Sequence, residues 1–180
     1  MTTTGWTTFE TPLGWGGLAW SDCGVTGIHL PEPDHSKVRA QLRRRFPAAA
    51  EASPPPAIED AIAAMTSLVC GERVDLSRVE LDQTGVDAFD QQVYAVARRI
   101  PPGETLSYGQ IATRLGDPKL ARDVGQALGR NPFPLVVPCH RVIAANGRLG
   151  GFSARGGVST KQRLLEIEQA NVSWQLSLGV

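Results

Sequence analysis

The stretch at residues 134–141 places narrow limits on the fold around it. Two prolines bracket the apolar residues 135–137, and the second proline is followed directly by Cys139, His140 and Arg141. Because proline is tolerated at the ends of strands and not in their interiors, residues 135–137 are predicted to form a buried, strand-like segment. Cys139 is therefore expected where buried backbone turns out toward a surface or a pocket.

The side chains after the second proline suggest a reactive thiol. A thiol is a nucleophile only as the thiolate, and positive charge nearby lowers its pKa. His140 and Arg141 supply that charge next to Cys139 in the sequence. A free cysteine is also commonly a small buried apolar residue, and sequence neighbours need not touch in the fold. Both interpretations stay open on spacing alone.

The cysteine usage favours a reducing compartment. Three cysteines, Cys23, Cys70 and Cys139, are an odd number at wide spacing, which argues against a disulfide framework. No apolar run is long enough to span a membrane, and the first residues lack the features of a signal peptide. We therefore expect a cytoplasmic protein.

Cys23 and His29 could be metal ligands, but no third ligand lies near them in the sequence, and no metal or cofactor is expected.

Charge is distributed unevenly along the 180 residues, although the formal net charge is zero. Residues 1–84 hold 7 Lys and Arg against 11 Asp and Glu, a net charge of −4. Residues 85–180 hold 11 against 7, a net charge of +4. The basic half also holds Cys139, which suggests a polyanionic partner for that half.

Residues 1–84 are predicted to form an α/β domain. Short β-prone runs separated by turn residues indicate a small antiparallel sheet, and apolar residues at a four-residue step indicate helices. The expected strands cover residues 6–11, 17–20, 25–30 and 74–81, the expected helices cover 35–46 and 58–69, and 48–56 is expected to be a proline-rich linker.

Residues 85–171 are predicted to form a mainly α domain. Asp87 is expected to cap a helix that ends before Pro101, and Ser107 opens a capping box for a shorter helix. Gly116 ends that helix and Asp117 caps the next, which together make a helix-turn-helix pattern. Most such helix pairs do not bind DNA, so an ordinary helix pair is the alternative. The second helix would present Lys119, Arg122, Gln126 and Arg130 to a nucleic acid, although it also carries Asp123.

The residues after Cys139 suggest a carboxylate partner for its neighbour. A strand-like run at 142–145 leads to a glycine-rich loop at 150–157, and Ser159 is expected to begin the last helix as a capping box. Glu168 shares the apolar face of Leu164, whereas Glu166 points away with Arg163. A buried carboxylate needs a partner, and the imidazole of His140 is the obvious candidate. The sequence thus predicts a Cys139–His140–Glu168 relay, in which the carboxylate orients the imidazole and the imidazole removes the thiol proton.

With these residues assembled, the C-terminal half resembles the O6-alkylguanine-DNA alkyltransferases, the methylated-DNA–protein-cysteine methyltransferases. The resemblance rests on residues 100–108, 121–125, 131–132, 138–143 and 164–168. It implies a ribonuclease-H-like N-terminal domain at 1–84, a winged-helix DNA-binding domain at 85–171 and a tail at 172–180. It also implies irreversible transfer of an alkyl group from O6-alkylguanine, and from O4-alkylthymine, in duplex DNA to Cys139.

The resemblance implies a role for each matching residue. His140 would be the base through a bridging water, Glu168 its orienter, and Asn131 a brace for the turn around the thiol. Tyr108 would bind the flipped guanine and help to protonate it, and Arg122 would fill the gap in the duplex. The base edge would be held by Val142, Phe152 and Ser153, and the DNA surface would include Lys119, Gln126 and Arg130. A monomer is expected, with cooperative assembly on DNA as an option.

The sequence departs from the family pattern in three places. Phe152 stands where many relatives have tyrosine, which removes a hydroxyl from the loop. The loop through Ala154 and Arg155 is longer than in some relatives, and Asp123 is acidic where a small neutral residue is common. A DNA-binding module or damage sensor in which Cys139 is incidental is the runner-up interpretation. A cysteine hydrolase that uses the same relay is the third.

Overall fold

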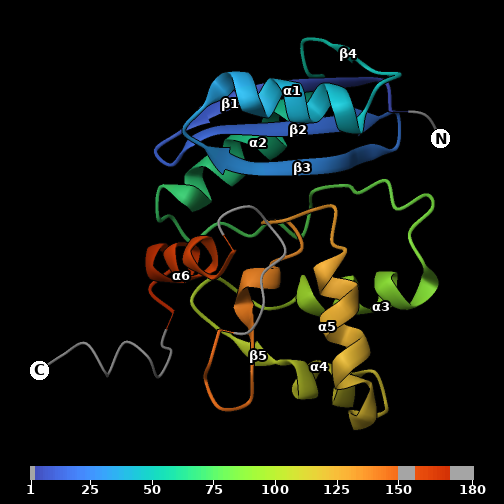
Figure 1. Ribbon diagram of the computed structural model, residues 1–180, viewed down its shortest axis with the longest axis vertical. Coiled ribbons are helices and arrows are strands. Elements are labelled where there is room, and N and C mark those ends of the chain that lie inside the picture. Colours follow the sequence, from blue (N-terminus) through green and yellow to red (C-terminus); the bar gives the residue numbers. More distant parts are fainter. Residues whose placement is uncertain (1–2, 150–156, 171–180) are drawn as a thin grey trace, which may run out of the picture. The chain divides into compact units, whose positions relative to one another are not determined.

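The computed structural model describes residues 3–149 and 157–170. The chain divides into two compact units (Figure 1). The first unit is made of Met1–Gly85 together with Pro132–Val136, and the second of Val86–Asn131 and Val137–Val180. None of the helices in the described ranges has the length and apolar character needed to cross a membrane.

The first unit is built on a four-stranded sheet with the order β3-β2-β1-β4. Neighbouring strands are antiparallel except for β4, which runs parallel to β1. The expected antiparallel sheet is therefore right for three strands and incomplete, because the sheet is mixed and its fourth strand lies inside the stretch expected to be a linker. The strands are β1 (Gly5–Thr11), β2 (Gly14–Ser21), β3 (Gly24–Glu32) and β4 (Ala50–Glu51).

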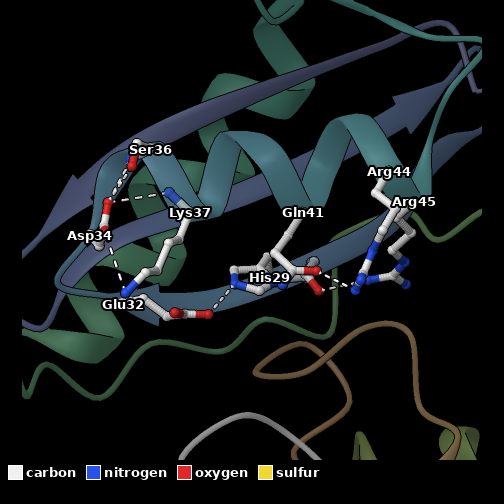
Figure 2. A network of polar contacts seen from close by, with 9 residues as sticks. His29, Glu32, Asp34, Ser36, Lys37, Gln41, Arg44 and Arg45 are labelled. Atoms are coloured by element: carbon white, nitrogen blue, oxygen red, sulfur yellow. Dashed lines mark hydrogen bonds and ion pairs between the residues drawn. The ribbon is translucent and has the colours of Figure 1, made fainter.

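Two helices accompany this sheet, and both predicted helices are confirmed: α1 (His35–Arg45) and α2 (Pro56–Val69). The Asp34 carboxylate caps α1 by accepting from the backbone N–H groups of Ser36 and Lys37, as Figure 2 shows. The inner face of α1 carries Val38 and Leu42, which pack with Trp6 and Ala19 in the core. The predicted strand at 74–81 is wrong, because this stretch is irregular and forms only an isolated bridge between Val25 and Leu81.

The segment Pro132–Val136 belongs to the first unit although its neighbours in sequence belong to the second. The backbone N–H of Ile28 donates to the Pro132 carbonyl at 2.9 Å, and Arg45 donates to the same carbonyl at 3.3 Å. Residues 135–137 are buried as expected. The strand-like conformation is wrong, because Leu135 has φ +73° and the backbone forms a turn.

The second unit is mainly helical, as predicted. Its helices are α3 (Ala88–Ala97), α4 (Tyr108–Arg114), α5 (Ala121–Gly129) and α6 (Gly157–Ile167), with short 3-10 helices η1 (Pro118–Leu120) and η2 (Cys139–Arg141). A parallel pair of two-residue strands, β5 (Leu106–Ser107) and β6 (Val142–Ile143), joins the start of α4 to the end of η2.

Helix ends in this unit follow the sequence signals in most places. Ser107 and Gln110 form the expected capping box of α4, and the side chain of Asp117 accepts from the Lys119 N–H at the start of η1. The capping box expected at Ser159 is wrong, since α6 already begins at Gly157. Asp87 occupies the N-cap position of α3 but makes no side-chain cap hydrogen bond.

Candidate active site

Cys139 is the first residue of η2, directly after Pro138. The residue is buried, with 8% of its surface exposed, and its backbone N–H donates to the Val137 carbonyl at 2.8 Å. Pro138 ends the buried turn, and the chain continues as the 3-10 helix η2. The three residues of η2 therefore lie inside the unit, although they are polar or charged. All three, Cys139, His140 and Arg141, are buried.

The thiol lines a pocket of about 840 Å³ in the second unit. Most of the wall is contributed by small residues of α4, α5 and the segment after β6, which leave room for a flat ligand close to the backbone. Tyr108 and Arg122 bring the polar groups of that wall. The lining residues are Tyr108, Gly109, Ala121, Arg122, Gly125, Leu128, Gly129, Cys139, Ala144 and Ala145.

Asn131 braces the turn that carries the thiol. Its Nδ2 donates to the Val137 carbonyl at 2.9 Å, the same carbonyl that accepts from the Cys139 N–H. A hydrogen bond from the Asn131 side chain also lowers the pKa of Cys139, against the larger effect of burial, which raises it. The Asn131 amide therefore both braces the backbone turn and stabilises the thiolate.

Glu168 receives three hydrogen-bond donors in the interior of the unit. His140 Nε2 lies 2.9 Å from Oε1, while Arg141 donates from Nη2 to Oε1 at 2.7 Å and from Nε to Oε2 at 2.9 Å. The expected pairing of Glu168 with His140 is present. Arg141 is a second partner of Glu168 that was not predicted, because its position in the sequence indicates only a charge beside the thiol. Its Nη1 donates to the Ile100 carbonyl at 2.6 Å, which anchors the pair.

These contacts fix the charge and the tautomer of His140. Burial raises the pKa of Glu168, but hydrogen bonds from His140 and Arg141 outweigh burial and lower it to about 2. Burial lowers the pKa of His140 more strongly than Glu168 raises it, so the imidazole is neutral at neutral pH. A neutral ring beside a carboxylate keeps its proton on Nε2. The lone pair is then on Nδ1, a buried atom without a hydrogen-bond partner in the described ranges.

Lys161 is a buried cation that the sequence analysis missed. The residue has 0% exposure, its Nζ donates to the Val142 carbonyl at 2.5 Å, and it lies 5.7 Å from the centre of the Tyr108 ring. Burial lowers the pKa of Lys161 to about 8, while the charge of Cys139 acts in the opposite direction. The ammonium in turn lowers the pKa of the thiol. A signal was available, because Lys161 stands three residues before Leu164 on the same helix face as Glu168.

The remaining predicted residues divide into three groups. Tyr108 lines the pocket, and burial followed by the charge of Cys139 raises the pKa of its hydroxyl. Four of these residues are exposed, namely Lys119, Arg122, Gln126 and Arg130, and Arg130 also forms an ion pair with Asp90. The expected residues Phe152 and Ser153 lie outside the described ranges.

Two further expectations concern the carboxylate Glu166 and the imidazole His29. Glu166 points away from Glu168 as predicted, and lies 3.7 Å from Arg163. Within the part of the chain that the structure describes, there is no group of three or more His, Cys, Asp or Glu side chains that could hold a metal ion. In the first unit, His29 Nε2 lies 2.7 Å from Glu32 Oε1, so its ring has a carboxylate partner; Figure 2 draws this contact.

Comparisons with known proteins agree with this arrangement. The family model described as 6-O-methylguanine DNA methyltransferase, DNA binding domain, matches residues 88–170. A methylated-DNA–protein-cysteine methyltransferase of Mycobacterium bovis is 36% identical over 171 residues, which cover 95% of this chain and 96% of the relative. Another, of Methanothermobacter thermautotrophicus, is 38% identical over 88% of this chain and 82% of the relative.

Solved structures give the same result for the fold. The crystal structure of Mycobacterium tuberculosis OGT in complex with DNA matches with a TM-score of 0.73 at 35% sequence identity. The match covers 92% of this chain and 93% of that chain. The O6-methylguanine-DNA methyltransferase of Pyrococcus kodakaraensis has a TM-score of 0.71 at 27% identity, over 91% and 98%. The expected resemblance is confirmed, and the chain belongs to the methylated-DNA–protein-cysteine methyltransferases, the enzymes of direct-reversal DNA repair.

Proposed function

We propose that this protein transfers the alkyl group of O6-alkylguanine in duplex DNA to the sulfur of Cys139, once per molecule. This proposal rests on a thiol at the wall of a pocket, followed in the sequence by a neutral imidazole whose Nε2 is hydrogen-bonded to a buried carboxylate. The same chemistry applies to O4-alkylthymine. Displacement at an alkyl carbon requires a thiolate and a proton donor for the leaving base, and it requires no cofactor.

The proton path follows from the tautomer of His140. Its Nδ1 lone pair accepts the thiol proton through a bridging water, and the imidazolium that forms is stabilised by Glu168. The sulfur then attacks the alkyl carbon, the carbon–oxygen bond breaks, and the electron pair stays on the guanine. Tyr108 supplies a hydrogen bond and a proton to the departing base. The product is a thioether, which water does not cleave, so each chain acts a single time.

The target atom lies inside the duplex, so the base has to leave the stack. In our proposal α4 and α5 form a helix-turn-helix, and Arg122 at the pocket wall fills the gap left by the flipped nucleotide. Lys119 and Gln126 are exposed and available for contacts to DNA. The backbone at Val142, together with Phe152 and Ser153, would hold the edge of the base.

We also propose the finer organisation expected from the resemblance. A ribonuclease-H-like domain covers residues 1–84 together with Pro132–Val136, which belongs to the first unit, a winged-helix DNA-binding domain covers the rest of 85–171, and 172–180 is a tail. Cys23 and Cys70 are exposed and are not joined in a disulfide, which supports a reducing, cytoplasmic environment. The protein is proposed to act as a monomer that can assemble cooperatively on DNA.

The test is the mass of the protein after incubation with a duplex that contains O6-methylguanine. We expect each chain to gain one methyl group, located on the peptide that contains Cys139, with no second turnover. A chain that binds the duplex without gaining mass would instead be a damage sensor. Repeated hydrolysis of an ester or amide by Cys139 would support a cysteine hydrolase.

A further inference from the structure

The ion pair between Asp90 and Arg130 is a charged contact that the proposed reaction does not use. Asp90 lies in α3, and 6% of its side chain is exposed. Arg130 follows α5 and donates from Nε to Oδ2 at 3.1 Å and from Nη2 to Oδ1 at 2.8 Å. A buried carboxylate is costly without a partner, and the two-point geometry of arginine fixes its direction as well as its charge.

A second contact ties the same end of α5 to α3. Tyr94, one turn after Asp90 and 1% exposed, donates its hydroxyl proton to the Ala127 carbonyl at 2.9 Å. The backbone N–H of Arg130 also donates to the Ala127 carbonyl, at 3.1 Å. The last turn of α5 is therefore held at its backbone by Tyr94 and at its C-terminal residue by Asp90.

The chain leads directly from this fixed point to the thiol. Asn131 follows Arg130, and its own N–H donates to the Leu128 carbonyl at 3.3 Å, which continues the helical winding by one residue. Its side chain then reaches the Val137 carbonyl and the thiol of Cys139. A shift of Arg130 by a fraction of an ångström would move the amide that braces the turn.

We propose that the Asp90–Arg130 ion pair is a positioning device, which holds Asn131 against Cys139 and thereby sets the reactivity of the thiol. This assigns Arg130 a different task from the DNA contact expected from the sequence, because two of its three guanidinium nitrogens are occupied by Asp90. The inference extends the proposed function, in which Cys139 is the alkyl acceptor, but its main measurement does not depend on methylated DNA.

The experiment compares Asp90→Asn, Arg130→Gln and the double variant with the unmodified protein. The rate at which iodoacetamide alkylates Cys139 is followed against pH by peptide mass, which separates it from the two exposed cysteines. We expect the apparent pKa of the thiol to rise by roughly one unit in each single variant, so alkylation at neutral pH slows about tenfold. The double variant should be no slower than either single variant, because both remove the same contact.

Two controls separate positioning from loss of stability and from DNA binding. Glu51→Gln removes a more exposed arginine–carboxylate pair, formed with Arg39 in the first unit, and should leave the thiol profile unchanged. Arg130→Lys keeps the charge beside Asp90 without the two-point geometry, and covers the case in which Arg130→Gln does not fold. We expect Arg130→Lys to shift the profile part of the way. Asp90→Asn should bind duplex DNA as the unmodified protein does.

Two results would overturn the inference. In the first, Arg130→Gln keeps the thiol profile but weakens duplex binding with a shallower salt dependence, as a phosphate contact would. In the second, all variants lose stability while their thiol profiles stay the same, which would make the pair purely structural. If the variants shift the profile but the unmodified protein accepts no methyl group from DNA, the positioning role stands and the proposed function fails.

Discussion

Replacing Glu168 by glutamine tests the relay most directly, because three donors converge on this carboxylate. Oε1 accepts from His140 and from Arg141 Nη2, and Oε2 accepts from Arg141 Nε. Glutamine has one acceptor oxygen in place of two. If that oxygen takes the place of Oε1, the amide NH2 points at Arg141 Nε, so one contact becomes a clash of donors. Arg141 also keeps a buried charge without a counter-charge.

The size of the loss follows from the pKa of Glu168, which is lowered from 4.5 to about 2. At about 1.4 kcal/mol for each unit, the carboxylate contributes about 3 kcal/mol to the free energy of unfolding. This agrees with the roughly 3–5 kcal/mol found when one partner of a buried ion pair is removed. Because the pKa is lowered in the folded state, the contribution is complete above pH 4.5 and is lost as the pH falls toward 2.

The assay is urea unfolding of the two proteins between pH 7 and pH 3, with alkyl transfer measured in parallel. We expect Glu168→Gln to be less stable by about 3 kcal/mol at pH 7, and the difference to shrink below pH 4.5. Transfer should slow by roughly a hundredfold, because the imidazolium that forms loses the negative charge that stabilises it.

The matched control is Glu166→Gln on the outer face of the same helix. Glu166 lies 3.7 Å from Arg163, and 37% of its side chain is exposed. Its loss should change the stability by less than about 1 kcal/mol and leave transfer unaffected. Equal effects of the two substitutions would refute the reasoning, since a relay requires only the inner carboxylate.

Four other substitutions test separate parts of the site. Cys139→Ala should abolish methyl transfer and leave duplex binding intact in a gel-shift assay; methyl transfer to another cysteine would contradict the assignment. Arg122→Ala should slow repair in duplex DNA but barely affect a free O6-benzylguanine base, whereas Asp123→Ala should tighten duplex binding by an amount that shrinks with salt. Lys161→Met should raise the apparent pKa of Cys139 in the iodoacetamide profile, because the buried ammonium favours the thiolate; an unchanged profile would show that its charge is unimportant.

Most of the helices and the inner carboxylate could be predicted because their signals are local. Apolar steps of three and four residues fixed the faces of the helices, and the same step placed Glu168 inside and Glu166 outside. The capping box of α4 likewise depends only on Ser107 and Gln110, which are three residues apart. Such signals require no knowledge of what the element packs against.

Failures occurred where the conformation depends on distant partners. Strand β4 has two residues, and it exists because β1 offers an edge for it. The left-handed conformation of Leu135 has no sequence signal of the kind that glycine gives. From its place in the sequence, Arg141 is expected beside the thiol, and Arg130, just past a helix, is expected at the DNA. Their guanidinium groups instead pair with the buried carboxylates of Glu168 and Asp90, which are distant in the sequence.

The path of the chain near the thiol has a consequence for protein engineering. Pro132–Val136 belongs to the first unit, although the residues on both sides of it belong to the second. No single cut in the sequence therefore separates the two units. A fragment that begins at Val86 would carry Phe133, Leu135 and Val136, which are 1–2% exposed in the intact protein, without the rest of the unit to which they belong. Such a fragment should aggregate. A soluble one is better designed by replacing these apolar residues with polar ones while Asn131 and Val137 are kept.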